Sequence, residues 1–293
     1  MQHTAIITDS GVRLGNIAER AALPVTILPN QITTASGAFL KEQEPDNEEA
    51  LALLAKSSSP PILEPPTPEM YARAFTTLSR DADQIVCVCP SRYLTSHWEH
   101  ASRGAQMTAG TCPIRLIDSQ LISAGQALAT NAIAEAIANQ PQINDIERLA
   151  RTIAARTYFM IAVEQVEMLR HIETLSAEHV LFSAMLNVKP ILSMESGLLH
   201  AVAKARSRAH AIDRLLEFAT EFPNADSVLI LHDHKSHDIG ERLYTRLSGV
   251  APAENVAAMV YNPSLAALIG LSAIGIAIVT APTEKADDFS GDA

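Results

Sequence analysis

Hydroxyl and imidazole side chains are concentrated in the stretch CPSRYLTSHWEHA, which runs from Cys89 to Ala101. This stretch follows a short apolar run, 85–88, and leads into a segment with helical periodicity, which indicates a junction between a strand and a helix. Hydroxyls and free amides at the start of a helix suit a carboxylate or a phosphate ligand. The same residue types are also the preferred N-caps of helices, so a purely structural role stays open. The side chains concerned are Ser91, Thr95, His97 and His100.

Two more segments place hydroxyl groups at the ends of apolar, strand-like runs. One is the T-D-S sequence at 8–10, and the other is Asp118-Ser119 followed by Ser123. In an open parallel sheet, ligands bind outside the carboxyl ends of the strands. If these runs form such a sheet, the three segments share one of its edges, and we predict a ligand-binding site there.

A histidine-rich segment, HDHKSHD at 232–238, contains three imidazoles and two carboxylates within seven residues. Such side chains bind metal ions when they converge, so a metal-dependent hydrolase using His232, His234 and His237 is one hypothesis. The alternative is that the segment caps a helix while its histidines face solvent. The sequence contains no G-x-G-x-x-G motif, P-loop or G-x-S-x-G elbow, which argues against dinucleotide, ATP and serine-hydrolase sites. We therefore expect no cofactor and no enzymatic turnover.

Composition and charge exclude several classes of partner. The 293 residues carry 33 Asp and Glu against 22 Lys and Arg, a net charge of -11, without a cluster of basic residues. Nucleic-acid and anionic membrane surfaces require clustered Lys and Arg, so neither partner is expected. The N-terminus lacks the pattern of a signal peptide, and the longest apolar stretch, 264–279, is shorter than the ~20 residues of a membrane helix. We expect a cytoplasmic protein without stable membrane insertion, in which Cys87 and Cys89 are buried thiols on one face of a strand.

Strand-like and helical patterns alternate through the first half of the chain, which predicts parallel βαβ units and an α/β fold class. We assign 1–157 to an N-terminal domain with a parallel sheet, 158–282 to a C-terminal α/β domain, and 283–293 to a disordered tail. The turn residues E-S-G at 195–197 predict a hairpin in the second domain.

Other local patterns predict helices and a break between them. Helices are expected at 12–22, over most of 165–186, and after Thr67 as N-cap with Pro68 at the first helical position. The proline-rich segment 57–68 is predicted to lack regular structure, because each proline lacks a donor and pushes its predecessor out of the helical region.

Several of these segments, taken in order, resemble motifs of the DegV family, bacterial proteins that bind a fatty acid. The stretch from Ser91 to Ala101 resembles the family's S-S-x-L-S-G-T-Y-Q-S-A without a gap, with Thr95 where the family has serine. The segment MLNVKPIL at 185–192 resembles L-L-N-I-K-P-I-L. Further similarities are I-T-D-S at 7–10 to V-T-D-S, P-T-P-E at 66–69 to P-S-P-E, I-D-S at 117–119 with S-A-G at 123–125 to I-D-S and S-x-G, S-G at 196–197 to D-G, and A-R-S at 205–207 to V-R-T.

The resemblance, which extends to about Val279, implies a two-domain architecture with an acyl chain in a tunnel and its polar head at the cleft between the domains. It also implies that several members present the bound fatty acid to a separate kinase subunit and have no turnover of their own. Apolar residues near Ile191 and in 265–278 would line such a tunnel, although core packing would use the same residues. The positions that we predict to contact the ligand are Ser91, Thr95, Ser96, His97, Asp118, Ser119, Arg206, Leu63 and Leu268.

The chain departs from the family at the positions that hold the carboxylate. The family's threonine, arginine and histidine fall on Leu63, Thr174 and Leu268, while Thr95 keeps a hydroxyl that could donate to the ligand. Burial of a carboxylate without compensating donors costs several kcal/mol. Either His97 and backbone amides replace the lost donors, or the ligand is no longer an ordinary free fatty acid.

Two residues in the matched motifs have alternative interpretations. His97 stands one residue beyond the expected helix start, where a protonated imidazole could pair with an anion, or the side chain could simply be exposed. Arg206 is the strongest remaining cation and either contacts the ligand or forms a surface ion pair. If the head-group site has been lost altogether, the chain is a DegV-like interaction or regulatory module that binds no fatty acid.

Overall fold

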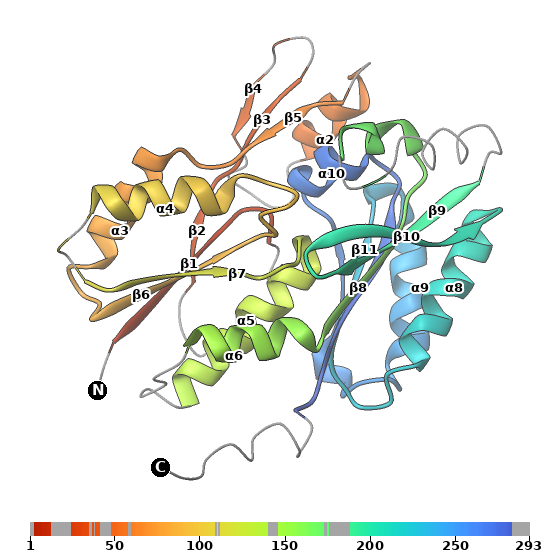
Figure 1. Cartoon of the computed structure of the whole chain (residues 1–293). Coiled ribbons are helices and arrows are strands. Elements are labelled where there is room, and N and C mark those ends of the chain that lie inside the picture. Colours follow the sequence, from red (N-terminus) through yellow and green to blue (C-terminus); the bar gives the residue numbers. More distant parts are fainter. Residues whose placement is uncertain are drawn as a thin grey trace.

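Over the residues that the computed structural model describes, the chain forms three β-sheets with helices packed between and around them (Figure 1). These residues are 3–12, 25–34, 37, 39–41, 48–57, 60–108, 110, 112–139, 146–172, 175 and 188–282. Within them, every helix is too short or too polar to cross a lipid bilayer.

The first sheet is parallel and has the strand order β2-β1-β6-β7. Its strands are β1 (Thr4–Asp9), β2 (Val25–Leu28), β6 (Gln84–Cys89) and β7 (Ile114–Asp118). The residues of β1 and β6 are buried almost throughout, as parallel strands covered on both faces require. Helices α3 (Pro68–Leu78) and α4 (His97–Met107) cover one face, and α5 (Ser123–Asn139) covers the other (Figure 1). The parallel βαβ arrangement predicted for the first half of the chain is confirmed.

The second sheet has the strand order β10-β9-β8-β13-β11-β12, in which β11 and β12 pair in parallel and the other pairs are antiparallel. Its strands are β8 (Thr157–Ala162), β9 (Lys189–Glu195), β10 (Leu198–Ala205), β11 (Ala225–His232), β12 (Val256–Val260) and β13 (Ile274–Thr280). Helices α8 (Arg208–Thr220) and α9 (His237–Leu247) pack on one face, while α5 packs on the other. Strands β9 and β10 form the predicted hairpin, whose turn residue Gly197 has a φ angle of 84°.

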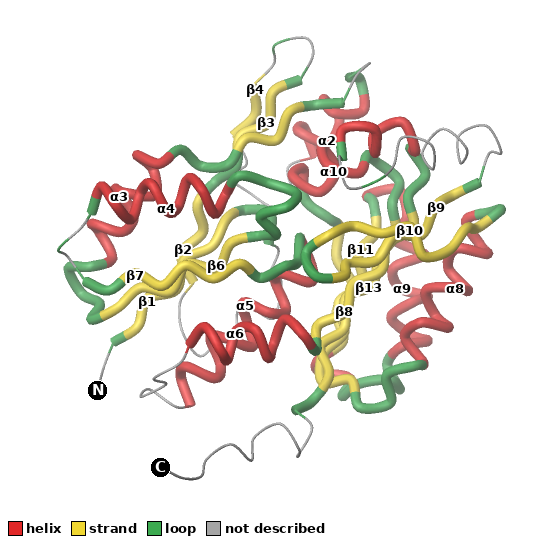
Figure 2. Tube along the Cα trace, viewed as in Figure 1, coloured by secondary structure: helices red, strands yellow, loops and turns green. Residues whose placement is uncertain are grey.

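Helix α5 lies between the two large sheets and packs against both of them (Figure 2). It contacts β1 of the first sheet and β8, β11 and β13 of the second. Its sequence, SAGQALATNAIAEAIAN, is rich in alanine and mostly buried, because small side chains let a helix lie close to a sheet on each side. One hydrophobic cluster therefore runs from Ile6 and Val86 through Leu128 to Phe159 and Leu229. The division into domains at 157 stays a prediction.

A small antiparallel sheet with the order β4-β3-β5 stands beside the first sheet (Figure 1). It consists of β3 (Gln31–Thr33), β4 (Phe39–Lys41) and β5 (Ile62–Glu64). The prediction that 57–68 lacks regular structure is therefore wrong for three of its residues. The prolines flank this strand rather than interrupt it, so its residues keep their N–H donors, and Leu63 pairs with Ile32. Strand β5 contacts α10 (Pro263–Ile269) from the far end of the chain.

The segment 165–186, predicted to be mostly helical, contains a short 3-10 helix, Val166–His171, among its described residues. For 166–171 the predicted α-helix is corrected to a 3-10 helix, and residues 173, 174 and 176–186 lie outside the described ones. Side chains at every third position of the described part are buried, which is the period of a 3-10 helix rather than the 3.6 of an α-helix. These side chains are Val166, Leu169, Ile172 and Leu175.

Two local predictions are confirmed. The hydroxyl of Thr67 caps α3 and accepts a hydrogen bond from the backbone N–H of Met70 at 3.4 Å. Cys87 and Cys89 are buried thiols on one face of β6, with their Sγ atoms 3.8 Å apart. The predicted helix at 12–22, apart from Val12, and the predicted tail at 283–293 lie outside the described residues.

Close packing of α3 on α4 requires a glycine at position 104. A Cβ atom on Gly104 would lie 2.6 Å from the Cβ atom of Tyr71 and 2.8 Å from the carbonyl oxygen of Pro68. We expect Gly104→Ala to lower the free energy of unfolding by about 2 kcal/mol, because neither atom can move without a shift of α3. Chemical denaturation measures the change. Gly249→Ala is the control, since a Cβ atom there meets nothing within 4 Å; equal stability of the two variants would contradict this account.

Candidate functional site

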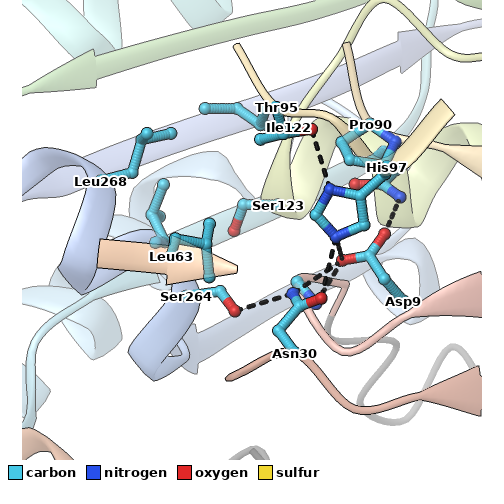
Figure 3. A pocket seen from close by; sticks show the side chains of 13 residues that line it. Asp9, Asn30, Leu63, Pro90, Thr95, His97, Ile122, Ser123, Ser264 and Leu268 are labelled. Atoms are coloured by element: carbon cyan, nitrogen blue, oxygen red, sulfur yellow. Dashed lines mark hydrogen bonds and ion pairs between the residues drawn. The ribbon is translucent and has the colours of Figure 1, made fainter. Parts of the chain in front are cut away.

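The carboxyl ends of β1 and β6 meet the start of α5 and helix α10 at a small buried pocket (Figure 3). Strands β1, β6 and β7 are neighbours in the sheet, so the three predicted polar segments do share one edge. The cavity has a volume of about 30 Å³, room for roughly one or two water molecules. The residues that line it are Asp9, Gly11, Asn30, Leu63, Pro90, Thr95, His97, Ile122, Ser123, Gln126, Ser264, Leu265 and Leu268.

The carboxylate of Asp9, which is 2% exposed, is the centre of the polar end of this pocket. Its Oδ1 accepts hydrogen bonds from the backbone N–H of Gly11 at 2.7 Å and from the side-chain amide of Asn30 at 3.0 Å. Its Oδ2 accepts a hydrogen bond from the side-chain amide of Gln126 at 2.7 Å. Neutral donors therefore satisfy both oxygens, and the described lining of the pocket contains no Lys or Arg.

His97 is hydrogen-bonded through both ring nitrogens (Figure 3). Its Nδ1 lies 2.9 Å from Oγ1 of Thr95, and its Nε2 lies 2.8 Å from Oδ1 of Asn30. The amide group of Asn30 donates to Asp9 and to Ser264, so the amide oxygen is left to accept a proton from Nε2 of His97. In the neutral ring, Nδ1 then accepts the hydroxyl proton of Thr95.

Burial determines the charge of His97, which is only 1% exposed. Desolvation lowers the pKa of the imidazole, and this effect outweighs the attraction of Asp9, whose Oδ1 lies 3.6 Å from Nε2. The ring is therefore neutral near pH 7. The alternative of an exposed side chain is wrong, because the first turn of α4 faces the polar edge of the sheet instead of solvent. The pairing of a protonated ring with a ligand anion stays a prediction, which the lowered pKa disfavours.

Ser123 begins α5 and contributes its hydroxyl to the lining of the pocket (Figure 3). Its φ angle is 49°, in the left-handed region that residues other than glycine rarely adopt. The residue as a whole is 6% exposed, and its hydroxyl has no hydrogen-bond partner among the described residues. Backbone strain together with an unpaired hydroxyl on the pocket lining makes Ser123 a candidate contact for a ligand.

The other end of the pocket is apolar. Leu63 of β5 and Leu268 of α10 lie there together with Ile122 (Figure 3), and Leu265 also lines the pocket. Four of the positions predicted to contact a ligand thus line the pocket: Leu63, Thr95, His97 and Leu268. Their role in ligand binding stays a prediction.

Five other predicted positions do not line the pocket: Ser91, Ser96, Asp118, Ser119 and Arg206. The hydroxyl of Ser91 donates to the carbonyl oxygen of Gly197 at 2.5 Å, which joins the loop after β6 to the β9–β10 hairpin. Asp118 forms an ion pair with Arg92 at 3.1 Å. Ser96 and Arg206 are exposed, and Thr174 lies outside the described residues.

In the histidine-rich segment after β11, the described histidine side chains contact other protein groups. Within the described part of the chain, no group of three potential metal ligands converges there or elsewhere. The buried His232 places its Nδ1 2.9 Å from the carbonyl oxygen of Asp233, and the exposed His237 pairs with Glu241 at 3.3 Å. The side chain of His234 lies outside the described ones. Asp233 instead forms an ion pair with Arg208 at 2.9 Å.

The fold and the site define an α/β protein with a parallel sheet, a second sheet that carries a hairpin at one edge, and a polar pocket at the carboxyl ends of the parallel strands. A family model described as "Uncharacterised protein, DegV family" matches residues 3–281. The chain therefore belongs to the DegV family. It is 27% identical to a DegV domain-containing protein of Streptomyces coelicolor over 260 residues, which are 85% of this chain and 90% of that protein. A DegV domain-containing protein of Mycobacterium bovis is 28% identical over 221 residues, 72% of this chain and 76% of that protein.

Solved structures share the fold at low sequence identity. A fatty acid binding DegV family protein from Streptococcus agalactiae superposes with a TM-score of 0.82 at 18% identity, over 96% of this chain and 100% of that one. DegV from Bacillus subtilis, described as a fatty acid binding protein, gives the same TM-score, identity and coverage. The predicted DegV-like α/β fold, with a parallel sheet in the first half and a hairpin in the second, is confirmed.

Sequence reasoning missed three polar residues of the pocket: Asn30, Gln126 and Ser264. A signal for Gln126 was present, because it lies three positions after Ser123 at the start of a helix and so shares its face. Asn30 and Ser264 are 234 positions apart and meet through a 2.9 Å hydrogen bond, which no local pattern could predict.

Gln126→Glu places a second carboxylate where an amide now donates to Asp9. We expect the free energy of unfolding to fall by about 3 kcal/mol at about pH 8, because a donor is lost and two buried carboxylates repel. Repulsion raises the pKa of the new carboxyl, so this penalty is present above the unfolded pKa of Glu and shrinks as the pH falls and the group gains a proton.

Denaturation at several pH values tests this expectation. The control is Gln106→Glu on the exposed surface of α4, which should change stability by less than about 0.5 kcal/mol. If Q126E and Q106E behaved alike at every pH, Asp9 would not be the buried acceptor described above.

Proposed function

We propose that this chain binds a long-chain fatty acid or a related acyl lipid, with its polar head beside Thr95 and Ser123. The observation that supports this proposal most directly is that the pocket has a polar end around Asp9 and an apolar end formed by Leu63 and Leu268. A molecule with one polar tip and a hydrocarbon tail matches this division. The fatty acid binding of solved proteins with the same fold supports the proposal.

The pocket described here corresponds to a closed state of such a site. A cavity of about 30 Å³ does not hold an acyl chain, so apolar walls have to separate when a ligand enters. The side chains concerned belong to β5 and α10, a three-residue strand and a seven-residue helix. Their displacement leaves the two large sheets and α5 intact, so opening requires a local rearrangement rather than unfolding of a sheet.

The proposal includes a carrier role in the cytoplasm. The chain would hold its ligand without chemical turnover and present it to a separate kinase subunit, as the resemblance to the family implies. The loop that contains Ser91 and Tyr93 joins the hairpin through a buried hydrogen bond from Ser91 to Gly197, while Tyr93 is 57% exposed, so this loop offers a partner an exposed side chain close to Thr95 of the pocket.

A second candidate function is an interaction or regulatory module that has lost its ligand. The observation in its favour is that the polar network of Asp9, Asn30 and Gln126 is satisfied by protein groups alone and encloses little space. The two candidates differ in a measurable property, the lipid content of the protein.

Organic extraction of the protein purified from cells, followed by mass spectrometry, should recover stoichiometric acyl lipid. We expect Leu268→Trp to reduce this content at least tenfold, because the larger ring fills the apolar end of the pocket. Val202→Trp makes a similar change at a position that is 44% exposed and should keep the wild-type content.

Denaturation curves would show that both tryptophan variants are folded. Undiminished lipid in L268W would place the ligand elsewhere. Absence of lipid from every protein, together with no uptake of added fatty acid, would favour the interaction module.

A further inference from the structure

The polar end of the pocket carries one formal charge among its described residues, and that charge is negative. Asp9 is an acceptor of three hydrogen bonds from neutral groups, which fits an ionised carboxylate. His97 is the other titratable residue of the described lining, and its burial keeps it neutral; Glu99 and His100 act on it from α4 with opposite signs. An ionised ligand carboxylate would therefore lie beside a like charge without a described cation to balance it.

The directions of the hydrogen bonds specify what the pocket offers to a ligand. The hydroxyl proton of Thr95 is directed to acceptors of the protein, Nδ1 of His97 at 2.9 Å and the carbonyl oxygen of Ser91 at 3.4 Å, because Nε2 of the ring donates to Asn30. Thr95 therefore presents acceptor lone pairs. Ser123 as a residue is 6% exposed and lines the pocket, and its hydroxyl is unpaired among the described residues, so it can donate to a ligand.

The positive end of the α5 dipole does not reverse this conclusion. A helix start favours a nearby negative charge, and α5 begins at Ser123. Gln126 in its first turn already holds the carboxylate of Asp9 at 2.7 Å. The negative charge that the helix favours is thus supplied by the protein itself.

We propose that the head group recognised by this pocket is uncharged and donates a hydrogen to Thr95 while it accepts one from Ser123. A long-chain primary alcohol, a primary amide and an un-ionised carboxylic acid have this chemistry, whereas an ionised fatty acid does not. This inference rests on the proposed lipid-binding function and specifies its ligand class. Ser123 is its main new specificity residue.

Two probes with the same tail and different heads test the inference: 1-dodecanol and dodecanoate, each delivered from cyclodextrin to the full chain after delipidation. Isothermal titration calorimetry at pH 8.5 should give at least tenfold tighter binding of dodecanol. From pH 8.5 to 6.5, dodecanoate should bind about tenfold more tightly per pH unit, because its un-ionised fraction rises by that factor. Dodecanol binding should change less than about twofold, since the alcohol does not titrate and His97 stays neutral.

Substitutions separate the head-group contact from general packing. Ser123→Ala should weaken dodecanol binding about tenfold through loss of one hydrogen bond, while the exposed control Ser248→Ala leaves it unchanged. Leu268→His adds a group that can be protonated to the lining and should strengthen dodecanoate binding about tenfold at pH 6.5. Denaturation curves show whether each variant folds.

The outcomes distinguish this inference from the proposed function. Binding of neither probe would overturn the lipid-binding function itself. Tight dodecanoate binding that is constant from pH 6.5 to 8.5 would keep that function and overturn the uncharged head group. Wild-type affinity of S123A for dodecanol would remove Ser123 from the contact even if dodecanol binds.

Discussion

A buried carboxylate held by neutral donors constrains the polar edge of this protein. The donors to Asp9 come from three places: the loop after β1 (Gly11), the loop after β2 (Asn30) and the first turn of α5 (Gln126). A buried acceptor left without partners costs about 1–3 kcal/mol, and more when it is charged. The side chain of Asp9 therefore joins the loops after β1 and β2 to the first turn of α5. Asn30 is in turn hydrogen-bonded to His97, so α4 is joined to the same network.

Helix α5 connects the hydrogen-bond network around Asp9 to both large sheets. Its first turn holds Asp9 of the first sheet, and its length packs against β8 and β13 of the second sheet. The polar end of the pocket thus lies at the centre of the molecule. The apolar end belongs to β5 and α10, and Ser264 of α10 is hydrogen-bonded to Asn30 of the polar end at 2.9 Å. A buried hydrogen bond therefore joins the two ends, in addition to the packing of apolar side chains.

The sequence predicted the elements whose patterns are local. Apolar runs followed by T-D-S and by I-D-S predicted strand ends at one edge of a parallel sheet, and β1 and β7 do end at the same edge, with β6 between them. Strand β5 escaped prediction because prolines dominate the segment, while the three residues between them carry the pairing. The site was predicted in part: Thr95 and His97 stand at the expected junction, but the charge of His97 depends on its burial, which depends on tertiary packing. Ser264 joins the pocket through a contact across the length of the chain, which a single sequence does not contain.

The fold and the chemistry of the pocket are determined by different residues and can change independently. At 18% identity the two-sheet architecture is retained, because burial and small residues along α5 tolerate many combinations of apolar side chains. The head-group end tolerates fewer changes, since each buried polar group needs a partner of the opposite hydrogen-bonding type. The buried polar groups of the pocket and the apolar side chains of β5 and α10 are separate sets of residues, which the proposed function assigns to head-group selectivity and to tail binding respectively.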